Sequence, residues 1–315
     1  MGKFLEFSGD NSQNRRYIAE LLVAFTFAVL AAYVLLTIVS PLLITSENSL
    51  LRGIAATTYL FDVYMCHEMP ERSFAVGGQH MPLCERCFAI AAGALIAYPA
   101  AFWRRHFPKI LSDRRVVIAA IIASMGILGI DGVGQLLGLW ESITAVRVFT
   151  GVFSAFTVMF YLLCEVREKF PPRGSLFRPG VVLPAAIPFA ALLLAVLAAS
   201  AVVGSEYKSR DYVVGEAAAL NPRGAAGYDA FYIAPRAFSG TISADPYLQS
   251  YSDPVLHDIA SLGTRRHELG GWAVLALNGP AEYEGKYAFV SGGNGNYYYF
   301  DAWTGELVAA RRHGG

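Results

Sequence analysis

Five long apolar stretches constrain this chain more than any other feature of its sequence. A helix that crosses a bilayer needs about 20 apolar residues, and four of the five stretches are long enough. The stretches are Ile18–Ile44, Phe88–Trp103, Val116–Trp140, Val146–Cys164 and Val181–Gly204. Charged residues make up only 16% of the chain, against about 25% in soluble domains. The sequence therefore predicts an α-helical membrane protein with five transmembrane helices, with the lipid bilayer as its main partner.

Two segments qualify this prediction. Phe88–Trp103 spans roughly 24 Å as a helix, so we expect it to take in residues before it, which would put Cys84 and Cys87 at the membrane edge. Ser49–Met65 contains Arg52 and Asp62, and charged residues are costly within a bilayer. We therefore predict an interfacial or re-entrant helix there rather than a sixth span.

The placement of Lys and Arg predicts the orientation, because cytoplasmic loops carry an excess of these residues. Twelve cations fall on the side of the N-terminus and four on the other side. The four are Arg52, Arg72, Arg86 and Arg147. We therefore expect a cytoplasmic tail at 1–17, a five-span domain at 18–204 in the cell membrane, and an extracytoplasmic C-terminus. An outer loop at 66–87 belongs to the membrane domain.

This outer loop holds three of the four cysteines of the chain, in CHEMPERSFAVGGQHMPLCERC. Cys84 and Cys87 have the two-residue spacing that is common in tetrahedral zinc sites. Cys66 together with His67, or with His80 as a substitute, would complete a Cys₃His set, and Gly77-Gly78 and Pro82 supply turns that fold the loop back. The pattern predicts a zinc site with Cys66, His67, Cys84 and Cys87 as ligands.

Two other interpretations of the cysteines stay open at this stage. Disulfides form outside the cytoplasm, so Cys84 and Cys87 could be a redox-active pair with Cys66 as a resolving thiol. Alternatively, Cys66 is only a small buried residue. Cys164 lies at the inner end of its span and does not belong to the set.

Polar residues near the outer ends of two spans form a second candidate site. Asp131 and Gln135 are four residues apart and share a helix face, and Ser142 and Arg147 lie at the same level. An intramembrane carboxylate usually faces protein or water. We expect a polar pocket with an Asp131–Arg147 ion pair or a hydrogen-bond network in its wall, although the carboxylate could serve only to join two helices.

Arginines near this level suggest a ligand class for the pocket. Arg72, Arg86 and Arg147 would suit an anionic group such as a lipid headgroup phosphate, although they could equally pair with nearby glutamates. Asp131, Gln135, Arg147 and Arg72 are the candidate catalytic residues. The net charge is zero and there is no basic block, which gives nucleic acid no electrostatic footprint.

The motifs CHEMPERSF, PLCERC, DGVGQ and S-x-T-x-x-R-x-x-TG resemble a family of polytopic membrane proteins, domain of unknown function 2085. The resemblance covers about residues 50–165. The residues that match are Cys66, His67, Arg72, Ser73, Pro82, Cys84, Arg86, Cys87, Asp131, Gln135, Ser142, Arg147 and Gly151. The chain departs from the pattern at Phe88 and Ala89, where the family has Thr-Gly, and at Thr144, where an asparagine is expected. The resemblance supports the site and implies no named reaction.

The residues after Gly204 predict a small α+β domain outside the cytoplasm. Residues 205–250 show little pattern, which indicates a linker or a partly ordered region. In 251–315 we expect a helix at Asp253–Arg266, with Asp253 as its N-cap. The runs GWAVLALN, KYAFVSG, NYYYFD and a final strand after Thr304-Gly305 predict a meander of strands.

The functional hypotheses belong to three classes. The first is a membrane protein with an extracytoplasmic zinc site, structural or acting on anionic lipid headgroups. The second is a thiol–disulfide oxidoreductase linked to quinone, and the third is a scaffold or transporter with an extracytoplasmic protein partner. The sequence contains no GxSxG, HExxH or P-loop motif, so it does not decide whether the chain is an enzyme.

Overall fold

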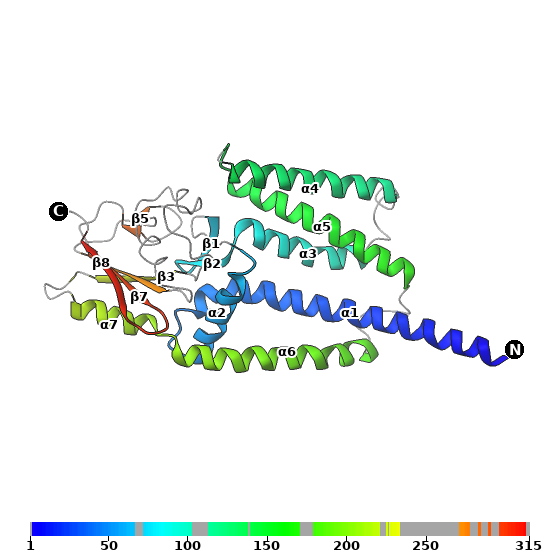
Figure 1. Cartoon of the computed structure of the whole chain (residues 1–315), viewed down its shortest axis with the longest axis horizontal. Coiled ribbons are helices and arrows are strands. Elements are labelled where there is room, and N and C mark those ends of the chain that lie inside the picture. Colours follow the sequence, from blue (N-terminus) through cyan, green and yellow to red (C-terminus); the bar gives the residue numbers. More distant parts are fainter. Residues whose placement is uncertain are drawn as a thin grey trace. The chain divides into compact units, whose positions relative to one another are not determined.

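A computed structural model gives the structure of residues 2–66, 72–102, 113–137, 139–170, 179–220, 225, 227–233, 271–277, 283–284, 289–290 and 296–312. Helices occupy most of the chain, and a small sheet follows them (Figure 1). The helices are α1 (Gly2–Leu43), α2 (Ser49–Asp62), α3 (Glu85–Phe102), α4 (Arg114–Leu136), α5 (Thr144–Lys169), α6 (Pro179–Glu206) and α7 (Arg210–Leu220). The strands are β1 (Ser73–Val76), β2 (Gln79–Cys84), β3 (Gly227–Ile233), β4 (Gly271–Leu277), β5 (Tyr283–Glu284), β6 (Phe289–Val290), β7 (Asn296–Asp301) and β8 (Leu307–Arg312).

Four helical segments among the described residues are long and apolar enough to cross a membrane. They are Gln13–Leu43, Arg114–Gln135, Thr144–Lys169 and Pro184–Leu220. These segments coincide with four of the five predicted spans. Residues 88–102 of the remaining stretch lie in α3, which has 18 residues and is not among the four. A helix also forms at the expected position between the first two stretches, as α2, whose N-cap Asn48 accepts hydrogen bonds from the backbone N–H groups of Leu50 and Leu51.

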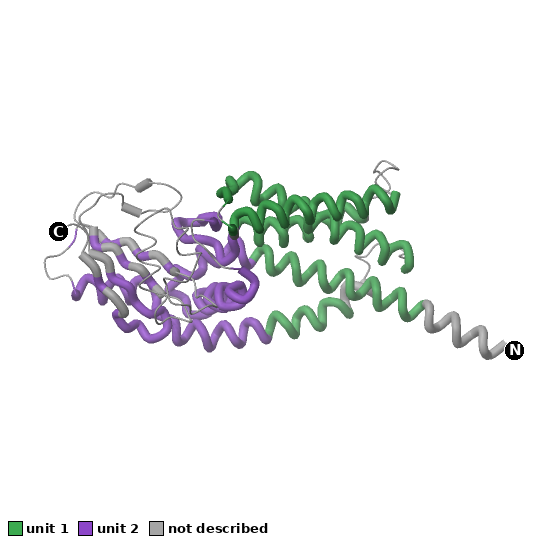
Figure 2. The backbone as a smooth tube through the Cα atoms, turned by 45° about the horizontal axis from the view of Figure 1, so that its top comes forward, with its two compact units in different colours: residues 1–35, 85–194 green, residues 36–84, 195–315 purple. Residues whose placement is uncertain are grey.

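The chain divides into two compact units (Figure 2). Unit 1 comprises residues 1–35 and 85–194, and unit 2 comprises residues 36–84 and 195–315. The predicted five-span membrane domain at 18–204 stays a prediction. The chain passes from unit 2 to unit 1 between Cys84 and Glu85, at the point where β2 ends and α3 begins.

In unit 1, helices α3 and α4 both pack along α5 (Figure 1). Hydroxyl groups join α4 to α5: Ser124 and Thr157 share a hydrogen bond of 2.9 Å, and Ser154 donates to the backbone oxygen of Ser124 at 2.9 Å. Without a hydrophobic driving force in lipid, helices associate through close packing and such hydrogen bonds. The N-terminal part of α1 contacts α3, because Tyr98 donates to Thr26 at 2.9 Å.

Unit 2 contains a short antiparallel hairpin that leads to the cysteines. Strands β1 and β2 are joined by Gly77 and Gly78, whose φ angles are +60° and +80°. Two residues with positive φ are the requirement of a type I′ turn, and glycine meets it without steric cost. The pair therefore folds the loop back as predicted, and the register places Ser73 opposite Cys84.

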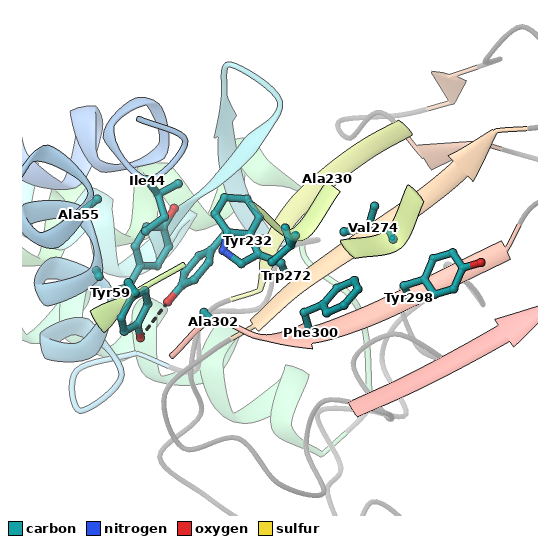
Figure 3. Packing of buried hydrophobic residues seen from close by; sticks show 14 of the residues in the cluster. Ile44, Ala55, Tyr59, Ala230, Tyr232, Trp272, Val274, Tyr298, Phe300 and Ala302 are labelled. Atoms are coloured by element: carbon teal, nitrogen blue, oxygen red, sulfur yellow. Dashed lines mark hydrogen bonds between the residues drawn. The ribbon is translucent and has the colours of Figure 1, made fainter. Parts of the chain in front are cut away.

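The sheet of unit 2 has the antiparallel order β3-β4-β7-β8, and α7 packs against β3 and β4. Its core contains Tyr232, Trp272 and Phe300, all of which are almost completely buried (Figure 3). Tyr59 of α2 joins the same core, with its ring centroid 5.0 Å from that of Tyr232. The Gln79 side chain extends the connection, because it donates to the backbone oxygen of Ala230 and accepts from the N–H of Tyr232.

The C-terminal predictions met three different outcomes. Strands form in GWAVLALN, in NYYYFD and after the Thr304-Gly305 turn, as β4, β7 and β8. Within KYAFVSG, the described residues Phe289 and Val290 form β6. The helix expected at Asp253–Arg266 lies outside the described residues. Residues 205–250, for which the sequence indicated a linker or partly ordered region, contain α7 and β3, and β3 is an edge strand of the sheet.

Candidate functional site

Three cysteine sulfurs come together where β2 leads into α3. Cys66, Cys84 and Cys87 each offer one sulfur atom, and all three atoms lie within 4.8 Å of one another. Thiolates bound to one tetrahedral zinc at about 2.3 Å would be about 3.8 Å apart. The set of donors and its spacing therefore fit a soft metal ion such as zinc.

Local structure explains why these cysteines meet. Cys66 lies just beyond α2, and its N–H donates to the backbone oxygen of Asp62 at 2.8 Å. The hairpin then brings the chain back, so that the N–H of Cys84 donates to the sulfur of Cys66 at 3.3 Å. Cys87 is in the first turn of α3. The positive end of a helix dipole and N–H donors both favour the thiolate form that binds metal.

Of the two candidate histidine ligands, the structure describes only His80. His67 lies outside the described residues. His80 is 4% exposed, its Nδ1 lies 3.1 Å from the backbone oxygen of Met81, and its ring meets Tyr59 edge-on. The metal-ligating group found among the described residues consists of the three cysteines. The fourth ligand therefore stays a prediction.

The predicted Asp/Gln/Ser cluster forms a hydrogen-bond network around Arg86 in unit 1. Arg86 at the start of α3 forms an ion pair with Asp131 of α4 and donates to Gln135 at 3.0 Å. Ser142 donates to Asp131 at 2.5 Å and accepts from Gln135 at 2.5 Å. Asp131, Gln135 and Ser142 therefore meet as expected, and a residue of the Cys/His motif lies at their centre.

A second ion pair lies beside the first. The carboxylate of Glu85, whose side chain is 0% exposed, pairs with Arg147 at 3.3 Å and accepts from Thr144 at 3.0 Å. Arg147 also contacts Glu141 at 3.5 Å, but that side chain is 65% exposed. Of the two expected alternatives, an Asp131–Arg147 ion pair or a hydrogen-bond network, the structure has the network. Asp131 pairs with Arg86, and Arg147 pairs with Glu85.

The sequence pattern suggested nearby glutamates as partners of the arginines but did not single out Glu85 or Glu141 as site residues. A signal for Glu85 was present, because Glu85 and Arg86 are charged residues between two cysteines at the start of an apolar helix. Arg72, another candidate site residue, is half-buried in the turn before β1 and belongs to unit 2, whereas Asp131, Gln135 and Arg147 belong to unit 1.

Gly151 allows the close approach of α5 to the first turn of α3. A Cβ atom on Gly151 would lie 2.8 Å from the backbone oxygen of Arg86 and 2.8 Å from the Cβ of Ala89. We predict that Gly151→Ala lowers the free energy of unfolding by about 1–3 kcal/mol, because a backbone atom has to move. Thermal unfolding of the purified chain in detergent measures this.

Gly126→Ala is the matched control for this substitution, because a Cβ atom at Gly126 of α4 meets nothing within 4 Å. Alanine is the better helix former, so this variant should be unchanged or more stable by up to about 1 kcal/mol. Equal effects of the two substitutions would contradict the close contact at Gly151.

Comparison with known proteins places this region in a family. A family model described as "predicted membrane protein" matches residues 66–161, which include the cysteines and both ion pairs. An uncharacterized protein of Methanocaldococcus jannaschii is 40% identical over 114 residues, which are 33% of this chain and 66% of that protein. An uncharacterized protein of Methanothermobacter thermautotrophicus is 35% identical over 89 residues, 28% of this chain and 76% of that protein.

No solved structure matches the chain. The matched segment of each archaeal relative corresponds to a third or less of this chain but to about two thirds or more of the relative. The family model covers the region that carries the candidate site. On these matches, the chain belongs to the family of predicted membrane proteins called domain of unknown function 2085.

Proposed function

We propose that this chain is a multi-pass protein of the cell membrane that binds one zinc ion through Cys66, Cys84 and Cys87. The observation that carries the proposal is the approach of three sulfur atoms to within 4.8 Å of one another. A disulfide joins two sulfurs, whereas a zinc site uses three or four. Three sulfurs in mutual proximity therefore favour a metal over a pair of thiols that cycle between oxidation states.

We propose His67 as the fourth ligand, next to Cys66 in the sequence. A Cys₃His set closes the coordination sphere, which is the usual arrangement of a structural zinc, whereas a catalytic zinc keeps a position open for water. With this set the ion stabilises the junction of β2 and α3. The proposal assigns no reaction to the chain.

The proposed topology has five spans, with the N-terminus in the cytoplasm and the cysteine site and C-terminal domain outside. The excess of cations on the N-terminal side supports this orientation. The fifth span would be α3, whose 18 residues reach about 27 Å, close to the hydrocarbon thickness of about 30 Å.

Binding of anionic lipid headgroups is the less favoured version of the proposal. Arg86 and Arg147 each face a buried or nearly buried carboxylate, from Asp131 and Glu85 respectively. Their charges are therefore balanced within the protein, and a phosphate would have to displace these carboxylates. The arrangement favours a role in holding helices together.

Zinc analysis of the purified full-length chain tests the proposal. We expect about one zinc per chain, and a loss of most of it in Cys66→Ser, Cys84→Ser and Cys87→Ser, because thiolates dominate the affinity of such sites. Cys164→Ser is the matched control: this cysteine is buried among apolar residues of unit 1 and should leave the zinc content unchanged.

Thiol trapping of the same chain in cells separates zinc binding from redox chemistry. A zinc site predicts reduced thiols that resist alkylation until the metal is chelated. A metal-free chain with Cys84 and Cys87 joined in a disulfide would overturn the zinc proposal in favour of thiol–disulfide exchange.

A further inference from the structure

The sequence Cys84-Glu85-Arg86-Cys87 places two charged residues between two proposed zinc ligands. Helix α3 begins at Glu85, so Glu85, Arg86 and Cys87 are consecutive residues of its first turn. Consecutive helical residues point about 100° apart. The Cα–Cβ directions of these three residues are therefore set together, so contacts that hold Glu85 and Arg86 also fix the direction from which Cys87 is presented.

Partners on two different elements hold these two charged side chains. Glu85 is bound by Thr144 and Arg147, both from α5. Arg86 is bound by Asp131 and Gln135, both from α4. The first turn of α3 is therefore held from two directions by groups that are not part of the three-cysteine cluster.

We infer that Glu85 and Arg86 are positioning residues for the zinc site, and that Asp131 on α4 and Arg147 on α5 act on the metal through them. This inference rests on the proposed zinc site and adds the groups that set its affinity. A thiol that is already oriented, as Cys87 is here, loses less conformational freedom when the metal binds, and the affinity rises accordingly. Groups that orient metal ligands typically contribute about 10–100-fold in affinity.

The coupling is reciprocal by thermodynamic necessity. If the ion pairs raise the affinity for zinc, zinc binding must strengthen the ion pairs by the same factor. Loss of the metal would therefore loosen the contacts of α3 with α4 and α5, and the cysteine site would report on helix packing within unit 1.

The test is a competition titration of zinc against a chromophoric chelator, with the full-length chain in detergent. We expect Asp131→Asn to weaken zinc binding about 10-fold or more, although Asp131 offers no atom to the cysteine group. Asp131→Glu, which keeps the charge, should recover part of the affinity. The absorption of the cobalt(II)-loaded chain should keep its thiolate-to-metal bands in both variants, because the ligand set is unchanged.

Ser124→Ala is the matched control, because Ser124 also joins α4 to α5 but contacts Thr157 and Ser154 rather than the first turn of α3. It should change the zinc affinity by less than about threefold, if orientation of the ligands is what matters. Gln135→Ala is the second variant: it removes a hydrogen bond to Arg86 but no charge, and should weaken zinc binding in the same direction as Asp131→Asn.

The outcomes separate this inference from the proposed function. A wild-type chain that binds no zinc overturns the zinc site itself. A wild-type chain that binds zinc, with unchanged affinity in Asp131→Asn or, where that variant does not fold, in Gln135→Ala, overturns the positioning role and leaves the zinc site intact. Equal weakening by Ser124→Ala also overturns it, because general loosening of the helices would then explain the effect.

Discussion

Replacing Glu85 with alanine is expected to lower the free energy of unfolding by about 3–5 kcal/mol, the usual cost of leaving a buried charge without its partner. The Glu85 side chain is fully buried and that of Arg147 is 8% exposed. Glu141, the other carboxylate at Arg147, is mostly exposed and cannot replace a buried partner. Chemical or thermal unfolding of the purified chain in detergent measures the change.

Two further variants show whether burial of the Glu85–Arg147 ion pair is the reason for the loss of stability in Glu85→Ala. Glu141→Ala removes a carboxylate from the same arginine, but from an exposed position, and should cost no more than about 1 kcal/mol. The double variant Glu85→Ala/Arg147→Leu leaves no unpaired charge in the buried position and should recover most of the lost stability. A similar small loss for Glu85→Ala and Glu141→Ala would contradict the buried ion pair.

Replacing Trp272 with alanine should destabilise unit 2 by about 3–5 kcal/mol, through lost burial and the cavity left behind. Trp272 is 0% exposed, and its ring centroid lies 5.5 Å from that of Tyr232. Its indole N–H also donates to the backbone oxygen of Lys208 at 3.1 Å. Near-ultraviolet circular dichroism and limited proteolysis of the full chain measure the loss of packing in this unit.

Two further variants test this prediction: Trp272→Phe is a milder change at the same core position, and Leu307→Ala is a change at an exposed position. Phenylalanine keeps an aromatic ring in the core and gives up the hydrogen bond, so it should cost less than alanine, about 1–2 kcal/mol. Leu307, on the edge strand β8, is 41% exposed and should change stability by no more than about 0.5 kcal/mol. If Leu307→Ala were as damaging as Trp272→Ala, the core would not lie where the structure places it.

The sequence predicted the elements that depend on local patterns. Runs of about 20 apolar residues have few alternatives to a membrane helix, and four of the predicted spans recur as long helices. The Gly77-Gly78 turn followed from the conformational freedom of glycine. The convergence of Cys66 with Cys84 and Cys87 followed from their spacing and from that turn.

The partners in the ion pairs could not be predicted in the same way. Asp131 faces Arg86 rather than Arg147 because the rotation and register of α3 against α4 and α5 decide which side chains meet. Spacing along one helix carries no information on that rotation. The sequence pattern could therefore predict that these residues lie at one level of the membrane, but not which of them form ion pairs.

Strand β3 was missed for a different reason. Tyr228, Ala230 and Tyr232 are apolar residues at every second position, the spacing of a β-strand, but the run is short. Its pairing partner β4 begins at Gly271, more than 35 residues after β3 ends at Ile233. The pairing that stabilises β3 is therefore distant in the sequence, and the local pattern alone gave too weak a signal.

X-ray absorption at the zinc edge, on the purified full-length chain, identifies the atoms bound to the metal. A Cys₃His site should give three sulfur neighbours at about 2.3 Å and one nitrogen neighbour at about 2.0 Å. His67→Ala should remove the nitrogen neighbour and keep the sulfurs. A shell of oxygen atoms, or a preparation that contains no metal, would contradict a zinc site formed by Cys66, Cys84 and Cys87.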